Sequence, residues 1–576
     1  MHGRTRGVVF FLFLFISLIF LLQIHSMVKN DRFYDGVNRL AEDLENRESV
    51  AGVSGNFEKE KELIENFVDE GGWLVWGFRV EPKSLNPVSV DGYARWLTFP
   101  YIFEPLLFYD YNELKLKPFL AESYRISDDG LQITFRLRSD IHFSDGLAVT
   151  ADDIIFTYKT ITNPGIDAGD LASLYVDVES AEKIDDLTVC FKLKGPYFKA
   201  VENLSFWGIG VLPKHIYEFD NPEEFNNRVS EPVGSGPFVF EKWERGKEIV
   251  LRRNETYWGQ KASLEKIVYK FINNPTAAVQ SLRAHRIDMI IPEPDQFFDL
   301  AADGQFKKDF MCLSYRVPGT PFYFIGWNNR SRFFEDRRVR LAMTHIIDRT
   351  RIVERLLAGF GLVVTGPFYV DGPGYDSSVA PWSYDVEAAK KLLGDAGWVD
   401  NDGDGIREKD EAAFRFKFLY SADNVLYRRL AEFIQDESAK VGIEIILEPM
   451  EWSVLINRVG EGQFDAVLMG FSTSLLEDPY KLWHSSQIDG GSNYTGFRNS
   501  EADGIIEEIR RTLDDFERNT LCHRLHRLLH VEQPCTFLFT RPTFRLVDRR
   551  FENVEIYKLG VKYWRWYVPK ERQKYR

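Results

Sequence analysis

The sequence predicts a mixed α/β fold, because strand-like and helix-like segments alternate along most of its 576 residues. Residues 73–78 form a short apolar segment after a Gly-Gly break, which is typical of a buried strand. Residues 133–138 alternate apolar and polar side chains, as a half-buried strand does. Segments with helical spacing of apolar residues are 152–162, 386–396 and 424–441, and a further strand-like segment is 444–447.

The composition is that of a large soluble protein, with 44% hydrophobic and 28% charged residues. A chain of this length exceeds what one hydrophobic core usually holds, so we expect several domains. Its formal charge of −15 repels a phosphate backbone and argues against nucleic-acid binding. The four cysteines are too few and too scattered for a disulfide scaffold, and a bond between Cys522 and Cys535 is left open.

The N-terminus predicts export. Arg4 and Arg6 precede an apolar run over residues 8–22, the pattern of a secretory signal or a signal anchor. Neither an A-x-A-like cleavage site nor a cysteine for lipid attachment follows at residues 23–27. We therefore expect residues 1–27 to stay as a membrane anchor, with a cleaved signal peptide as the alternative.

Residues 28–71 predict a charged helical spacer between the membrane and the rest of the chain. Charged side chains dominate this stretch, and glycines interrupt it. The alternative is a loosely ordered tether. Apolar residues at helical spacing are Phe33, Val37, Leu40 and Leu44, and then Leu63, Ile64 and Phe67.

Several short motifs follow one another between residue 72 and about residue 570. Their chemistry suits a scaffold: Asp145-Gly146 favours a tight turn, and Thr150 is a helix N-cap with Asp152 and Asp153 in the first turn. The motifs lie at residues 104–107, 118–123, 142–146 (HFSDG), 150–154 (TADDI), 234–238, 253–258, 334–340, 396–398, 463–465 and 478–479.

In these motifs and their order the chain resembles the family 5 bacterial solute-binding proteins, which include dipeptide and oligopeptide receptors. The resemblance implies a two-lobed periplasmic-binding-protein fold of type II, with the extra domain of the oligopeptide-receptor class, that closes on its ligand by a hinge. The implied parts are lobe I (72–104, 229–318 and 530–576), the extra domain (105–228) and lobe II (319–529).

The resemblance also implies where a ligand contacts the chain. In peptide-binding relatives a loop after the first strand reaches the cleft, and a glycine and an aromatic residue on the facing segment contact the peptide backbone. An Asp that pairs with the ligand ammonium in those relatives has no counterpart in residues 472–475. Asp478 is either its substitute or part of a structural acid-Pro pair. The candidate ligand contacts are Asp91, Gly92, Tyr93, Gly470, Phe471, Ser472, Thr473, Ser474 and Asp478.

Residues 400–411 match the calcium-loop pattern D-x-D-x-D-G-x5-E. A strand-like run over 414–420 follows, where an EF-hand has its exit helix. A turn of the same composition without metal is the alternative. The candidate ligands are the carboxylates of Asp400, Asp402, Asp404 and Glu411 and the carbonyl of Ile406.

His523, His526 and His530 share one helical face beside Cys522, and they are candidates for a transition-metal cluster. The alternative is an ordinary packed helix, because leucines fill the same segment and one helix seldom supplies a full ligand set.

The sequence contains no G-x-S-x-G, H-E-x-x-H or P-loop motif, so we expect a binding protein that requires no cofactor. The expected function is the extracytoplasmic or periplasmic substrate-binding component of an ABC importer, which captures oligopeptides or a related solute. The expected partners are that solute, the inner-membrane permease and the membrane itself. A membrane-tethered sensor or chaperone on the same fold, or a hydrolase, are the alternatives.

Overall fold

The computed structural model describes residues 71–88, 92–228 and 231–575. These residues belong to one compact unit, Asp69–Arg576. The predicted anchor (1–27), all but the last residue of the predicted spacer (28–71) and the candidate contact Asp91 lie outside the described residues. Across the ranges that are described, no helix has the length and apolar character that a membrane crossing requires.

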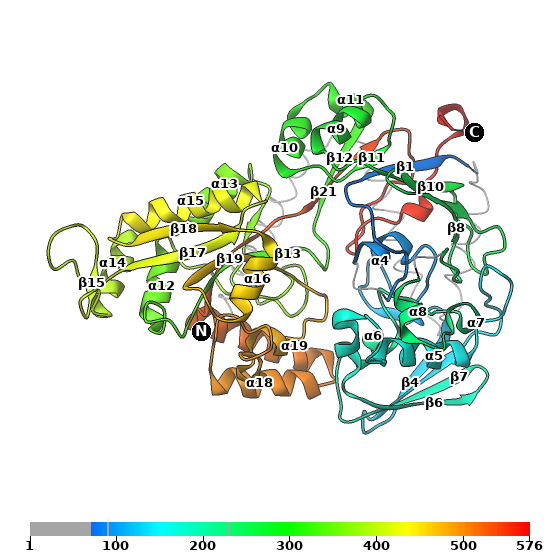
Figure 1. Ribbon diagram of the computed structural model, residues 1–576, viewed down its shortest axis with the longest axis horizontal. Coiled ribbons are helices and arrows are strands. Elements are labelled where there is room, and N and C mark those ends of the chain that lie inside the picture. Colours follow the sequence, from blue (N-terminus) through cyan, green and yellow to red (C-terminus); the bar gives the residue numbers. More distant parts are fainter. Residues whose placement is uncertain (1–70, 89–91, 229–230, 576) are drawn as a thin grey trace, which may run out of the picture. The chain divides into compact units, whose positions relative to one another are not determined.

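The first sheet has seven strands in the order β12-β21-β11-β1-β10-β9-β8 (Figure 1). Its central strand β1 (Trp73–Phe78) is the segment predicted from the sequence, and it pairs in parallel with β10 and β11. The other neighbours are antiparallel. The strands are β8 (Phe238–Glu244), β9 (Glu248–Arg253), β10 (Lys266–Phe271), β11 (Met289–Ile290), β12 (Phe310–Tyr315) and β21 (Thr543–Asp548), and the nearby helices are α4 (Gly92–Thr98), α9 (Pro275–Arg283), α10 (Pro294–Ala302) and α11 (Phe306–Asp309).

The second sheet has six strands in the order β14-β20-β13-β19-β17-β18. Strands β17, β18 and β19 are parallel, whereas β13 runs antiparallel to both β19 and β20. The predicted strand-like segments at 414–420 and 444–447 are β17 and β18. The strands are β13 (Pro321–Trp327), β14 (Leu362–Val363), β17 (Arg415–Ser421), β18 (Glu444–Met450), β19 (Ala466–Ser472) and β20 (Cys535–Thr540), and a small hairpin pairs β15 (Glu408–Lys409) with β16 (Ala412–Ala413).

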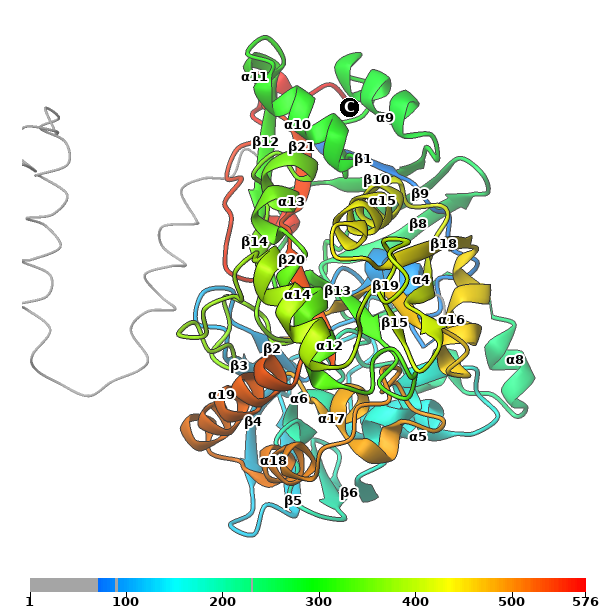
Figure 2. The same cartoon turned by 90° about the vertical axis from the view of Figure 1, so that its left-hand side faces the viewer.

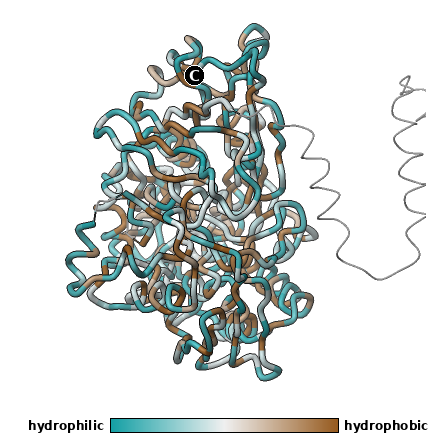
Figure 3. The backbone as a smooth tube through the Cα atoms, turned by 90° about the vertical axis from the view of Figure 1, so that its right-hand side faces the viewer, coloured by the Kyte–Doolittle hydropathy of each residue, from teal (hydrophilic) through white to brown (hydrophobic). Residues whose placement is uncertain are grey.

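Helices cover both faces of the second sheet, so its strands bury alternate side chains on opposite sides. Phe418 and Leu468 pack with α12 to α15, whereas Val467 and Met469 pack with α16, α18 and α19. Figure 3 shows the hydrophobic segments running through the interior, with hydrophilic segments in many outer turns. The helices are α12 (Arg337–His345), α13 (Arg349–Leu356), α14 (Val386–Asp395), α15 (Val425–Ala439), α16 (Trp452–Gly460), α17 (Tyr480–Trp483), α18 (Ser500–Arg511) and α19 (Asp515–Glu532).

A third, antiparallel sheet with the order β4-β5-β7-β6 belongs to the segment between β1 and β8. The predicted helix start is confirmed here: Thr150 and Asp153 form a capping box at α5 (Ala151–Thr162). The remaining elements of this segment are β2 (Leu107–Tyr109), β3 (Leu116–Pro118), β4 (Ala121–Ile126), β5 (Gln132–Leu137), β6 (Val178–Asp185), β7 (Thr188–Leu193), α6 (Ala200–Leu204), α7 (Lys214–Tyr217), α8 (Pro222–Asn226) and a short 3-10 helix at Gly169–Tyr175.

The chain passes between the first and second sheets at two short crossovers (Figure 2). Residues 316–320, the first crossover, join β12 to β13, and residues 541–542, the second crossover, join β20 to β21. The chain therefore goes back to the first sheet after Thr540, whereas the sequence placed this boundary at residue 530. The reason is that β20 is apolar and buried along its length, a pattern that suits a central strand of either sheet.

Candidate functional site

The parallel strands of the second sheet end at a common edge. Ser421 of β17 is in register with Met450 of β18, and the last residue of β19, Ser472, is opposite the first residue of β13, Pro321. β20 ends beside β13 at Thr540. Because both crossovers adjoin Pro321 and Thr540, they leave the second sheet from this carboxyl edge.

The first sheet has the same arrangement. Phe78 at the end of β1 is in register with Phe271 at the end of β10, and Tyr315 at the end of β12 is opposite Thr543 at the start of β21. The two crossovers therefore join the carboxyl edge of one sheet to the carboxyl edge of the other. In open α/β sheets, ligands bind outside the carboxyl ends of the strands.

Exposed aromatic side chains lie at both carboxyl edges. On α4, Tyr93 is 44% exposed and Trp96 is 54% exposed, and their rings lie 6.1 Å and 6.3 Å from that of Phe78. Trp452, which opens α16 directly after β18, is 45% exposed. The sequence prediction included Tyr93 and missed both tryptophans. Trp452 was missed because the predicted strand ended at residue 447, whereas the observed β18 continues to Met450, next to the start of α16.

The candidate contacts on β19 divide between its two faces. At Gly470, an added Cβ would lie 3.3 Å from the Tyr427 hydroxyl and 3.4 Å from Tyr323 Cδ1, so the absence of a side chain lets both tyrosines pack closely against the strand. The ring of Phe471 points to the other face and stacks on Phe324 at 5.3 Å. Of these three residues, only Ser472 is exposed.

The backbone at the end of β19 is paired on one side only. Its ladder with β13 continues to Ser472, whereas its ladder with β17 ends at the Leu419–Val467 pair. Within the described residues, the segment after Val467 therefore has a strand partner on the β13 side alone. Unpaired backbone N–H and C=O groups of this kind can accept an added strand.

Thr473 and Ser474 shape the loop after β19. Thr473 donates its hydroxyl to the Thr320 carbonyl at 2.8 Å, which ties this loop to the first crossover. Ser474 donates both its N–H, at 2.8 Å, and its hydroxyl, at 2.9 Å, to the Glu477 carboxylate. Both side chains are therefore used within the protein.

Asp478 has its carboxylate satisfied by three donors. It accepts hydrogen bonds from the Tyr197 hydroxyl at 2.9 Å, Arg510 Nε at 3.0 Å and the Tyr480 N–H at 3.1 Å. Arg510 also pairs with Asp177 at 3.0 Å, so the network links β19's loop to the segment that carries the third sheet. This geometry favours the structural alternative for Asp478 over a contact with a ligand ammonium.

The sequence profile of the bacterial extracellular solute-binding proteins, family 5 (middle region), matches residues 115–493, more than half of the chain. The chain belongs to this family. It is therefore a binding protein and not an enzyme, and its function is that of the substrate-binding component of an ABC importer.

Similar proteins in this solute-binding family carry different ligands. The oligopeptide-binding protein AppA of Bacillus subtilis is 33% identical over 505 residues, which cover 86% of this chain and 90% of that protein. Its structure with a nonapeptide aligns with a TM-score of 0.73 at 30% identity, covering 88% of this chain and 100% of the other. The structure of NikZ from Campylobacter jejuni with Ni(L-His) aligns with a TM-score of 0.71 at 25% identity, covering 86% and 99%.

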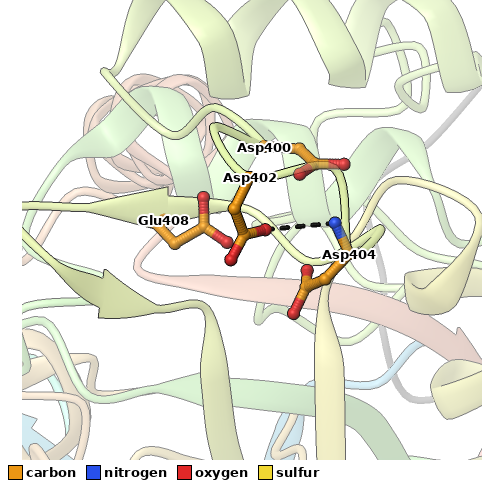
Figure 4. A group of neighbouring side chains, drawn as sticks. All are labelled: Asp400, Asp402, Asp404 and Glu408. Carbon is orange, nitrogen blue, oxygen red and sulfur yellow. Dashed lines mark hydrogen bonds between the residues drawn. The ribbon is translucent and has the colours of Figure 1, made fainter.

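The predicted calcium loop of this solute-binding protein gathers four acids (Figure 4). Oxygens of Asp400, Asp402, Asp404 and Glu408 all lie within 4.8 Å of one another. Glu411, predicted as the bidentate ligand, is not in the group. It lies in the turn between β15 and β16 at a positive φ of 61°, and that hairpin brings Glu408 back to the loop instead.

Backbone N–H groups already bind several of these carboxylates. Asp400 accepts hydrogen bonds from the N–H groups of Gly403 at 2.8 Å and Gly405 at 3.1 Å, and Asp402 accepts one from Asp404 at 3.1 Å. β17 follows the loop, as predicted, and no exit helix does. The loop is thus organised by its own turns, and calcium binding stays a prediction.

The three histidines of α19 contact three different partners. His526 is buried; its Nδ1 accepts the N–H of Asp376 at 3.1 Å, and its Nε2 lies 2.9 Å from the Thr365 hydroxyl. His523 bonds a backbone carbonyl, and His530 stacks on Trp382 with ring centres 5.2 Å apart. Burial lowers the pKa of both His526 and His530 to about 4. The arrangement favours the packed-helix alternative to a metal cluster.

The bond left open between Cys522 and Cys535 is not formed, since all four cysteines are free. Cys522 lies on α19 and Cys535 at the start of β20, and both are buried. Burial raises the pKa of the Cys522 thiol to about 12, which keeps the thiol protonated and unreactive.

Proposed function

We propose that this protein captures an extended oligopeptide between the carboxyl edges of its first and second sheets. The observation that carries the proposal is the half-paired end of β19. Backbone groups after Val467 that have a partner on only one side offer hydrogen bonds to an extended main chain. Recognition through the main chain suits a receptor that accepts many peptide sequences.

The two crossovers are suited to act as the hinge. Each is short, and together they contain Pro318, Gly319 and Pro542. Gly319 has a positive φ of 99°, a backbone conformation that side chains disfavour, so the bend is concentrated at a few residues. Domain closure of this kind is absorbed by small numbers of loop residues. A ligand drives it only by binding the closed form more tightly than the open one.

The exposed aromatic residues supply apolar contact for peptide side chains. Tyr93 and Trp96 come from the first carboxyl edge and Trp452 from the second, so closure on a peptide removes apolar area of both from water. The similarity to the oligopeptide-binding protein AppA supports peptide over the other ligands of the family.

The partners and the location follow from the N-terminal sequence and from the family. We propose that residues 8–27 hold the protein at the extracytoplasmic face of the membrane, where it delivers its ligand to an ABC-transporter permease. Gel analysis after carbonate extraction tests the anchor: intact protein should stay with the membranes. A soluble product whose N-terminus lies beyond residue 27 would contradict the anchor.

Native mass spectrometry tests the peptide proposal. The full-length chain, purified in mild detergent, is mixed with a library of synthetic pentapeptides of randomised sequence, and the retained mass is measured. We expect peptides to be retained intact. Retention of no peptide, or of a hydrolysed one, would contradict the proposal.

A further inference from the structure

The two crossovers each contribute an arginine, and the two differ in their partners. Arg316 in the first crossover makes a two-point ion pair with Asp371, at 2.8 Å and 3.0 Å. Arg541 in the second crossover donates its Nε to the Tyr323 hydroxyl at 3.1 Å. Among the described residues, no carboxylate lies within ion-pair distance of Arg541, and both of its terminal nitrogens are without an acceptor.

Arg541 is only partly buried, and it lies at the carboxyl edge of the second sheet. A guanidinium whose terminal N–H donors stay free matches the two oxygens of a carboxylate. Since the chain as a whole carries a formal charge of −15, an anionic ligand needs a local cation of this kind.

Two neighbouring tyrosines lie beside Arg541. Tyr323 and Tyr427 meet edge to face, with ring centres 6.1 Å apart. The Tyr427 hydroxyl lies 3.3 Å from where a side chain on Gly470 would begin. The missing side chain therefore lets the Tyr427 phenol, which can donate a hydrogen bond, lie close to the backbone of β19.

Two acids near this edge are engaged within the protein, whereas Asp423, after the end of β17, is exposed. Asp478 is held by Tyr197 and Arg510, and Glu451 accepts the N–H groups of Ser453 and Val454 at the start of α16. Residues 472–475 contain no acid.

We propose that Arg541, with the hydroxyls of Tyr323 and Tyr427, binds a carboxylate of the captured peptide. The inference rests on the proposed peptide-binding function and adds a ligand class to it: peptides are selected by an anionic group. That group is either the C-terminal carboxylate or the side chain of Asp or Glu, and both present the same two oxygens to the guanidinium.

Competition native mass spectrometry on the full-length chain tests this inference. The probes are one randomised pentapeptide library without acidic residues, made once with a free C-terminus and once as C-terminal amides. A third set consists of amides that contain one Glu. We expect at least one carboxylate-bearing set to be retained about ten- to hundredfold over the neutral amides. Preference for the first set identifies the C-terminus, and preference for the third identifies the side chain.

The variants R541Q and R541K decide the role of the guanidinium. R541Q should reduce the preference to about one, and R541K should retain part of it because it keeps the charge without the two-point geometry. R415Q is the matched control, since Arg415 begins β17 at the opposite edge of the same sheet and pairs with Glu444; it should keep the full preference. Melting curves confirm that each variant is folded.

The outcomes separate the inference from the function on which it rests. Equal retention of acids and amides by the unaltered protein, or an unchanged preference in R541Q, would overturn the carboxylate site and leave peptide capture standing. Retention of no peptide from any set would overturn both.

Discussion

The histidine face of α19 (His523, His526 and His530) and the carboxyl edges of the two sheets both carry side chains that can bind ligands. They differ in whether those side chains already have partners inside the protein. His526 is buried with both ring nitrogens bonded, and His530 is buried against Trp382. At the carboxyl edges, Trp96 and Trp452 are exposed, and the terminal nitrogens of Arg541 have no acceptor among the described residues. Residue type alone therefore does not mark a ligand site. A side chain whose partners are all internal supports the fold, whereas one that is left open is available to a ligand.

We expect the largest effect in the pH dependence of the free energy of unfolding, to which the buried histidines of α19 contribute. The pKa of His526 is lowered by burial to about 4, below the value of about 6.5 for an unfolded chain, so the unfolded state takes up the proton first. His526 therefore contributes stability above pH 6.5 that is lost as the pH falls toward 4. The expected loss between pH 8 and pH 5 is about 2 kcal/mol.

Urea unfolding at a series of pH values measures that loss. The variant H526Q should reduce the dependence over this window by the share of His526 and leave the share of His530, and it is less stable at pH 8. Peptide affinity of the folded protein at pH 8 should stay the same in H526Q. A pH dependence identical to that of the unaltered protein would contradict the buried, uncharged histidine.

The sequence left Asp478 open between a ligand contact and a structural acid-Pro pair, and the structure gives its carboxylate three internal donors. The variant D478N should lower the free energy of unfolding by about 1.5 kcal/mol, because it weakens charge-assisted bonds to Arg510 and Tyr197. Calorimetry should find the peptide affinity of the folded fraction unchanged. A loss of affinity of tenfold or more without a loss of stability would return Asp478 to the ligand site.

Substitution of the exposed tryptophans should lower peptide affinity and leave stability nearly unchanged, the reverse of D478N. W96A and W452A should each weaken peptide binding about tenfold, which corresponds to about 1.4 kcal/mol, because each removes apolar area that closure buries. Melting temperatures should change little, since both side chains are about half exposed. The matched control is F516A, an aromatic residue on α19 that is 81% exposed. Equal peptide affinities of F516A and W452A would contradict the claim that Trp452 contacts the peptide and Phe516 does not.

The acidic loop is expected to give the smallest effect. If calcium binds the folded loop, its presence at about five times its Kd adds about 1 kcal/mol to the free energy of unfolding. The increase should disappear in D402N and E408Q and persist in E411Q, because Glu408 and not Glu411 belongs to the group. Calorimetric melting with calcium and with excess chelator measures it. Identical curves in the two conditions would contradict the predicted site.

Local patterns made much of the fold predictable. Trp73–Phe78, the helices that begin near residues 386 and 425, and the Thr150 cap follow from periodicity and from the chemistry of neighbouring residues. The membership of β20 was not predictable, because an apolar run does not specify which sheet buries it.

The candidate site was predictable only in part, because its properties depend on residues far apart in the chain. The sequence placed Gly470 and Tyr93 near the carboxyl edges by resemblance. It did not reveal that Asp478 meets Tyr197, 281 residues away, or that Arg541 contacts Tyr323, 218 residues away. These contacts arise from folding and leave no local pattern.

Hydrogen–deuterium exchange of the full-length chain, with and without the retained pentapeptides at saturation, locates the backbone that contacts the ligand. Bound peptide should slow exchange at the backbone amides of Met469–Ser472 and in α4, where an extended main chain and the aromatic edge meet the ligand. Exchange in α19 and in residues 400–411 should not change. Protection confined to α19 or to the acidic loop, with Met469–Ser472 unaffected, would contradict peptide capture at the carboxyl edges.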